Sequence, residues 1–206
     1  VRDNSGLVLT AEVETLASRL RDSGYDTAAF VSAGVLEPGS GIERGFDVYD
    51  SPGSSAGHGQ GAFDERPGAA TVAAATRWLA ARAKAPTKPF LLFVHLYEPH
   101  APYLPSALVA ERFRQAPYDG EVATADSAVG RLLEALRAAG RYDSSAVLLF
   151  SDHGEGFGEH GETGHGVLLY REAIQIPLLL KLPHQARAGE TIETPVELTD
   201  LAPTVL

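Results

Sequence analysis

Residues 146–155 read Ala-Val-Leu-Leu-Phe-Ser-Asp-His-Gly-Glu, and this stretch decides the class of fold that we expect. Its first five residues are an apolar run, which is typical of a strand covered on both faces of a parallel sheet. Asp152 and His153 follow directly. Because ligands of open parallel α/β sheets bind beyond the carboxyl ends of the strands, the stretch predicts a buried strand that ends in a binding site.

On either side of this stretch, predicted helices and strands alternate, which favours an α/β fold with a largely parallel sheet. Further strands are predicted over residues 27–31, 90–95 (the clearest central strand) and 176–182. Helices are predicted over 11–23 with Thr10 as N-cap, over 67–85, over 119–139 and from near Thr199. The Gly-, Ser- and Ala-rich residues 51–67 are predicted to form a mobile surface loop.

Composition excludes several classes of function. The chain has 206 residues, 44% of them hydrophobic, and a net charge of −10, which argues against nucleic-acid binding. It has no cysteine, so disulfides, thiolate metal sites and a cysteine nucleophile are absent from this stretch. No apolar run approaches the roughly 18 residues of a transmembrane span. A metal bound here would need oxygen and imidazole ligands.

Asp152 and His153 are candidate metal ligands, because adjacent carboxylate and imidazole groups leave the predicted strand together. Such a pair suits zinc or manganese, and calcium if the imidazole is only a neighbour. The alternative is a turn in which Asp152 caps the next element and His153 is merely exposed. The position after an apolar strand, with a glycine-rich continuation, favours the metal site.

The glycine-rich residues 154–166 add further candidate polar contacts: Glu155, Glu159, His160, Glu162 and His165. A solvated acidic loop is the simpler interpretation for Glu159 and Glu162. His165 is the preferred functional candidate, because the apolar residues 167–169 follow it and predict a loop that re-enters the core.

His100 lies in a segment with prolines at 99, 102 and 105, which pre-order the backbone around it. Its imidazole could donate to an anionic oxygen or protonate a leaving group, or it could be an ordinary surface histidine. His95 ends a strand and is interpreted as a buried structural histidine. His58 and His184 lie in loop-like sequence and receive no role.

The motifs resemble the sulfatase branch of the alkaline phosphatase superfamily, and they occur in the family's order along nearly the whole chain. The similar segments are 16–28, 45–47, 90–103 (which ends in Pro-His-Ala-Pro-Tyr), 118–130, 149–166 and 200–204. The resemblance implies a mostly parallel sheet sandwiched between helices, with Asp152 and His153 as metal ligands. It further implies that His100 contacts the transferred group and that His165 contacts the same group or a second metal.

The family's nucleophile, a Cys or Ser that becomes formylglycine, lies upstream of the matching region. We therefore expect residues 1–206 to be a single partial catalytic domain that lacks the nucleophile part and a C-terminal part, and to be inactive alone. The resemblance implies one divalent metal, with calcium expected and manganese or zinc as alternatives. It also suggests a periplasmic or extracellular location.

The expected activity of the intact protein is hydrolysis of a small-molecule or glycan sulfate ester. Two alternatives remain open. His153 stands where many sulfatases have Asn, which resembles phosphoester hydrolases and phosphotransferases of the same superfamily. A non-catalytic binding domain that retains the fold is the third possibility.

Overall fold

The computed structural model describes residues 8–53, 65–82 and 88–206. Their contacts divide the chain into two compact units: an N-terminal unit that ends at Ala139 and a C-terminal unit over Gly140–Leu206. Each unit is described by itself. Within the described ranges no helix is long and apolar enough to cross a membrane.

The N-terminal unit is built on a parallel sheet with the strand order β2-β1-β3. Its strands are β1 (Asp26–Phe30), β2 (Val48–Asp50) and β3 (Phe90–Val94). Ala28 is in register with both Val48 and Leu92. The middle strand is therefore β1, whereas the sequence favoured 90–95 as central; β3 is half-buried along its length.

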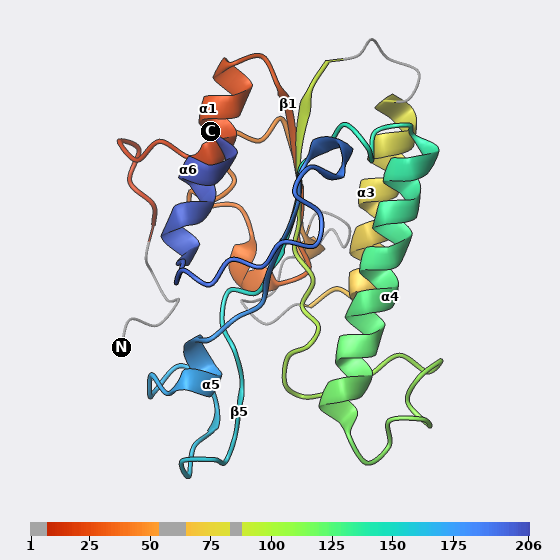
Figure 1. Cartoon of the computed structure of the whole chain (residues 1–206), viewed down its shortest axis with the longest axis vertical. Helices are drawn as coiled ribbons and strands as arrows, with labels where there is room; N and C mark the ends of the chain where they lie inside the picture. Colours follow the sequence, from red (N-terminus) through yellow and green to blue (C-terminus); the bar gives the residue numbers. More distant parts are fainter. Residues whose placement is uncertain (1–7, 54–64, 83–87) are drawn as a thin grey trace. The chain divides into compact units, whose positions relative to one another are not determined.

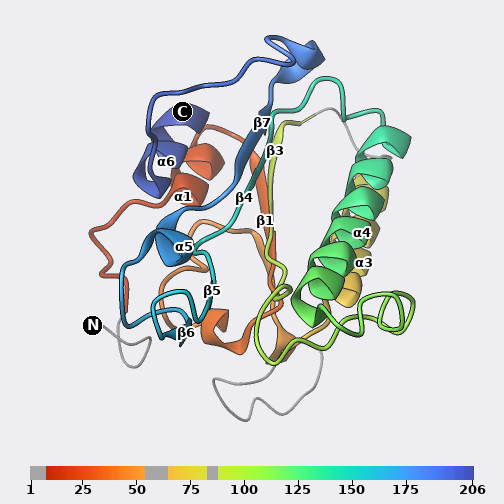
Figure 2. The same ribbon diagram turned by 60° about the horizontal axis from the view of Figure 1, so that its bottom comes forward.

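Helices cover both faces of this sheet (Figures 1 and 2). One face carries α1 (Leu16–Asp22), and the other carries α3 (Gly68–Arg82) and α4 (Pro117–Ala138). Ala28 and Phe30 of β1 form the core with Ala74 and Ala75 of α3. The alternation of a strand explains this, since residues two apart point to the same face. A short 3-10 helix, η1 (Gly34–Leu36), follows β1.

The boundaries of two predicted helices can now be compared with the structure. The first begins later than predicted: its N-cap is Thr15 and not Thr10, because Thr15 and Ser18 form a reciprocal capping box. The long helix α4 ends at Ala138, where Gly140 adopts a φ of 66°, as the sequence predicted.

The C-terminal unit contains two small antiparallel sheets. One pairs β4 (Val147–Phe150) with β7 (Leu178–Lys181), and the other pairs β5 (Gly156–Phe157) with β6 (Thr163–Gly164). The remaining elements of the unit are short: α5 (Arg171–Ile174), η2 (Pro183–Gln185), η3 (Leu198–Asp200) and α6 (Leu201–Val205).

The strand at 146–150 is confirmed, but its predicted burial is wrong. Leu149 and Phe150 are 42% and 37% exposed, and the paired strand β7 is similarly exposed. The pairing of β4 with β7 is also antiparallel. Two strands cannot cover both of their own faces, so an apolar run does not by itself bury a strand.

Two expectations fall partly outside the described residues. Most of the predicted loop at 51–67, including His58, lies in residues 54–64, and the predicted end of the second helix lies in 83–87.

Candidate functional site

The end of β4 turns sharply through residues 151–155. The Ser151 hydroxyl donates to the backbone oxygen of His153 at 2.6 Å, and the His153 backbone N–H donates to Asp152 Oδ1 at 3.1 Å. These local bonds bend the backbone directly after the strand. Asp152 and His153 therefore project beyond its carboxyl end, as the sequence predicted.

Gly154 allows this turn to pack against α5. Its N–H donates to the Ala173 carbonyl at 2.9 Å, and a Cβ at this position would lie only 2.0 Å from the Glu172 carbonyl oxygen. A larger residue would therefore force the turn away from α5. The glycine of the Asp-His-Gly sequence is thus explained by a close backbone approach.

The His153 ring is held in one tautomer. Its Nδ1 lies 2.8 Å from the Gly154 carbonyl oxygen, and a carbonyl only accepts, so Nδ1 carries the hydrogen. In the neutral ring the lone pair is then on Nε2. Asp152 Oδ1 lies 3.7 Å from that Nε2. Ligand atoms that bind one ion at about 2.0–2.4 Å lie about 3–4 Å apart, so these two atoms fit a shared divalent cation.

His165 lies beside His153 within the same unit. Their ring centroids are 3.7 Å apart with an interplanar angle of 26°. His165 Nδ1 donates to Glu155 Oε1 at 2.9 Å, and the Glu155 side chain is only 6% exposed. A buried carboxylate behind an imidazole fixes the orientation of the ring, as is common next to metals and reacting groups. Asp152, His153 and His165 are therefore brought together in the C-terminal unit.

The predicted reason for choosing His165 is nevertheless wrong. Residues 167–169 do not re-enter a core: Val167 and Leu169 are 70% and 81% exposed. The Glu155 carboxylate and the stacked His153 ring hold His165 in place instead. The sequence named Glu155 only as one of several polar candidates.

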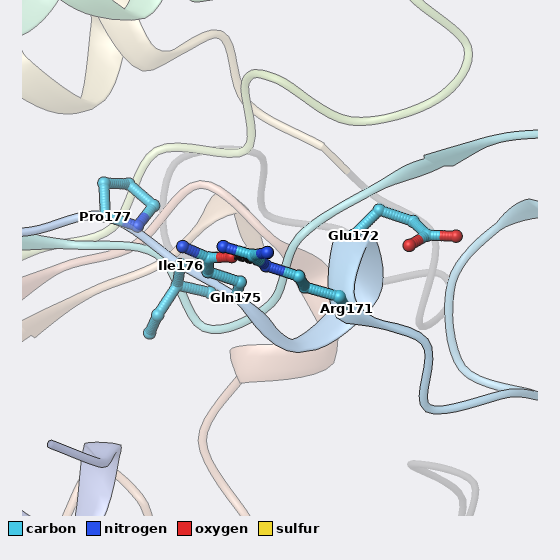
Figure 3. A pocket seen from close by; sticks show the side chains of 5 residues that line it. All are labelled: Arg171, Glu172, Gln175, Ile176 and Pro177. Carbon is cyan, nitrogen blue, oxygen red and sulfur yellow. Dashed lines mark hydrogen bonds between the residues drawn. The ribbon is translucent and has the colours of Figure 1, made fainter. Parts of the chain in front are cut away.

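His160 belongs to a second cluster at the hairpin of β5 and β6. Its ring stacks on Tyr170 with centroids 3.9 Å apart, and its Nε2 lies 3.4 Å from Glu172 Oε1. Next to this cluster, α5 and the residues after it line an open hollow of about 460 Å³ (Figure 3). There the Arg171 guanidinium donates to the Gln175 side chain, while Glu172 points away from them.

Glu159 and Glu162 are interpreted from the sequence as part of a solvated loop; Glu159 is exposed and Glu162 is half-buried, and both make local backbone contacts. Glu159 accepts from the Phe157 N–H at 2.7 Å, and backbone N–H groups lower the pKa of its carboxyl. Glu162 accepts from the Leu168 N–H at 3.2 Å. Neither contact involves Asp152 or His153.

His100 belongs to the N-terminal unit, in the irregular segment after β3. Its ring lies 4.4 Å from that of Tyr97, and its Nδ1 lies 2.7 Å from the Ala101 carbonyl oxygen. Burial and a hydrogen bond with Glu65 raise the pKa of Tyr97 to about 12, so its hydroxyl is protonated at neutral pH. His95, predicted as buried, is half-buried, and its N–H donates to the Phe30 carbonyl at 2.9 Å.

Two glutamates that contact the His100 segment received no role from the sequence. The His100 N–H donates to Glu121 Oε2 at 2.9 Å, and the Glu98 carboxylate accepts from the Gly68 N–H at 3.0 Å. Glu121 is 4% exposed on α4. A charged residue on the buried face of an amphipathic helix is the signal that could have found it.

The Sulfatase family model matches residues 4–206. The chain belongs to the sulfatase family. Sulfatases hydrolyse sulfuric esters and generally use a divalent metal ion.

The chain is also similar to several curated proteins. The chain is 34% identical over 99 residues to the multifunctional alkaline phosphatase superfamily protein PehA of Trinickia caryophylli, covering 46% of this chain and 18% of that protein. It is 30% identical over 130 residues to mouse steryl-sulfatase, covering 57% and 21%. It is 32% identical over 102 residues to N-acetylglucosamine-6-O-sulfatase of Bacteroides thetaiotaomicron, covering 48% and 18%. The chain thus spans about a fifth of the length of these relatives.

Solved structures share the fold at low identity. BT4656 in complex with its substrate D-glucosamine-2-N,6-O-disulfate superposes with a TM-score of 0.78 at 16% identity, covering 98% of this chain and 62% of that one. The phosphonate monoester hydrolase of Agrobacterium radiobacter gives 0.73 at 19% identity, covering 96% and 58%. The predicted α/β fold of alkaline phosphatase and sulfatase type is therefore confirmed.

Proposed function

We propose that the protein containing this chain hydrolyses sulfate esters with the help of a divalent metal held partly by Asp152 and His153. The observation that carries the proposal is the geometry of His153: its Nδ1 lies 2.8 Å from the Gly154 carbonyl oxygen, and its Nε2 lies 3.7 Å from Asp152 Oδ1. Family membership supports the type of ester.

A bound divalent ion would supply Lewis-acid stabilisation of negative charge on the sulfuryl oxygens. The family resemblance implies calcium, which would bind the Asp152 carboxylate and leave the His153 imidazole as a neighbour. If His153 Nε2 also binds the ion, manganese or zinc is the metal that we propose. The rest of the coordination would come from water and from residues outside this chain.

The two other histidines receive separate roles. His165, fixed by Glu155, would contact the sulfuryl group. His100 would give a proton to the leaving alcohol oxygen as the S–O bond breaks, or bind a non-bridging oxygen. The nucleophile would come from the upstream part of the protein, so residues 1–206 alone would be inactive.

The substrate class is a small-molecule or glycan sulfate ester. Two similar proteins are named for such substrates, an N-acetylglucosamine-6-O-sulfatase and an ulvan-active sulfatase. A screen of sulfated sugars and aryl sulfates with the full-length protein would identify the alcohol portion.

The test of the metal role compares Asp152→Ala with Asp22→Ala in the full-length protein. Asp22 is a matched control, because its side chain is 70% exposed and that of Asp152 is 71% exposed. We expect Asp152→Ala to lose bound metal by elemental analysis and to lose metal-dependent turnover of 4-nitrophenyl sulfate. Metal content and turnover equal to those of the control variant would contradict the proposal.

A phosphoester hydrolase or phosphotransferase is the second candidate, and His153 favours it. The similarity to a phosphonate monoester hydrolase supports the same candidate. Rates on matched 4-nitrophenyl sulfate and phosphate esters separate the two. A non-catalytic binding domain, the third candidate, would turn over neither ester and would purify without metal.

A further inference from the structure

The segment that carries His100 has few backbone donors. Prolines at 99, 102 and 105 have no N–H, so hydrogen bonds from the backbone of this segment must come from the residues between them. Two of these hydrogen bonds are accepted by the Glu121 side chain. The His100 N–H donates to Oε2 at 2.9 Å, and the Leu104 N–H donates to Oε1 at 2.8 Å. The Glu121 carboxylate thus holds the turn on both sides.

Glu121 is itself firmly placed. It lies in the first turns of α4, 4% exposed, on the helix face that also buries Ala128 and Leu136. The first residues of the His100 segment are held as well. The Glu98 carboxylate accepts from the Gly68 N–H at 3.0 Å, and Gly68 is the first residue of α3. Two glutamates therefore connect the His100 segment to the two long helices.

The burial of Glu121 has a cost in stability. Burial raises the pKa of its carboxyl, and the N–H groups of Leu104 and His100 offset this only in part. A raised carboxyl pKa means that ionisation is less favourable in the folded than in the unfolded chain. The Glu121 carboxyl therefore lowers the stability of the fold once the pH exceeds the ordinary pKa of a glutamate. Groups that are retained at such a cost are frequently functional.

We propose that Glu121 is a positioning residue that fixes the imidazole of His100 for its contact with the leaving group. This inference rests on the proposed role of His100. Glu121 acts through the backbone: its carboxylate holds the N–H groups of residues 100 and 104, and so places the backbone from which the His100 side chain extends. The Tyr97 ring at 4.4 Å and the Ala101 carbonyl oxygen at 2.7 Å from Nδ1 then orient the imidazole.

The experiment uses the full-length protein and four forms: wild type, Glu121→Gln, His100→Ala and Glu134→Gln. Glu134 is the matched control, since it is an exposed glutamate on the same helix. Gln keeps the size of Glu121 but turns one acceptor oxygen into an NH₂ group, which cannot accept from a backbone N–H. Each form is assayed on two sulfate esters. In an alkyl ester the leaving oxygen must be protonated as the S–O bond breaks, whereas 4-nitrophenolate can leave without a proton. Phosphate esters replace sulfates if the wild type hydrolyses only those.

We expect Glu121→Gln to lower kcat on the alkyl ester by about 10- to 100-fold, with KM little changed, since a small displacement of a catalytic group has this effect. On the 4-nitrophenyl ester the loss should be small. Hydrogen exchange of the His100 and Leu104 amides should become faster. Glu134→Gln should match the wild type in all three measurements.

The outcomes separate the inference from the proposed function. Equal loss on both esters would show a merely structural role for Glu121, and an unchanged alkyl rate would show no role; either overturns the inference. In both cases the proposed role of His100 stands if His100→Ala loses activity on the alkyl ester but not on the 4-nitrophenyl ester. If His100→Ala shows no such selectivity, or if the wild type hydrolyses neither ester class, the role of His100 is overturned and the inference with it.

Discussion

The Glu155 carboxylate lies close to the proposed metal ligands with its side chain only 6% exposed, and it accepts from His165 Nδ1 at 2.9 Å. We expect Glu155→Gln to reduce turnover by the full-length protein about 10- to 100-fold, the usual effect of losing a partner behind a functional histidine. The amide of the Glu155→Gln variant would still fill the space of the carboxylate. It can present either its oxygen or its NH₂ group to His165 Nδ1, so it does not hold the imidazole in one tautomer. Steady-state kinetics with a thermal unfolding curve would measure this.

The control for this prediction lies in the same loop. Glu159→Gln makes the same chemical change at an exposed carboxylate whose partner is the Phe157 N–H. Equal kcat values for the two variants would contradict the role given to Glu155.

Residue chemistry explains how much of the site could be predicted. Asp152 and His153 could be predicted as candidate metal ligands because a strand ending in ligand-type residues is visible in sequence. Glu121 was missed because its partners are the backbone N–H groups of His100 and Leu104, far away in the chain. Sequence patterns carry side-chain identity, but not the direction of backbone donors in irregular segments.

At the scale of elements, the cap of α1 gives a direct comparison of a predicted and an observed boundary. Thr15 accepts from the Ser18 N–H at 3.0 Å, whereas the predicted cap Thr10 lies exposed before the helix. We expect Thr15→Ala to lower the free energy of unfolding by about 1 kcal/mol. Thr10→Ala should change it by less than about 0.5 kcal/mol. Urea unfolding of both variants measures the difference, and the reverse order would support Thr10 as the cap.

Asp26 connects three elements, because its carboxylate at the start of β1 bonds to Arg82 at the end of α3 and to Lys88 before β3. Hydrogen bonds from Lys88 and Arg82 lower the pKa of Asp26 below its ordinary value of 3.8. A depressed pKa contributes stability that is present above the ordinary value and is lost as the pH falls through the folded-state value.

We therefore expect the melting temperature of Asp26→Asn to fall less than that of the wild type between about pH 5 and about pH 2. Melting curves across that range would show it. Asp22→Asn, an exposed aspartate with a single arginine at 3.6 Å, is the control and should follow the wild type. A parallel decline of all three proteins would argue against the role of Asp26.

At the scale of the whole molecule, the apolar residues of the C-terminal unit are unusually exposed. The pair Leu149 and Leu179 lies on one face of the β4–β7 sheet, and the pair Phe150 and Leu178 lies on the other. All four are at least 37% exposed. The sequence predicted a buried strand here because an apolar run is usually buried. The run does not show which other residues of the protein would pack against it.

Contiguous exposed apolar surface favours association, whereas single exposed apolar residues do not. We therefore expect residues 1–206, produced alone, to self-associate as the concentration rises and to bind a hydrophobic dye. Leu179→Lys should reduce both the self-association and the dye binding, because it replaces one member of the apolar pair formed with Leu149 by a charged residue. Leu108→Lys is the control: Leu108 is more exposed, at 91% against 59% for Leu179, but it lies outside the β4–β7 sheet. Sedimentation velocity would distinguish the two variants. An equal reduction by both would show that the charge itself, and not the sheet surface, controls association.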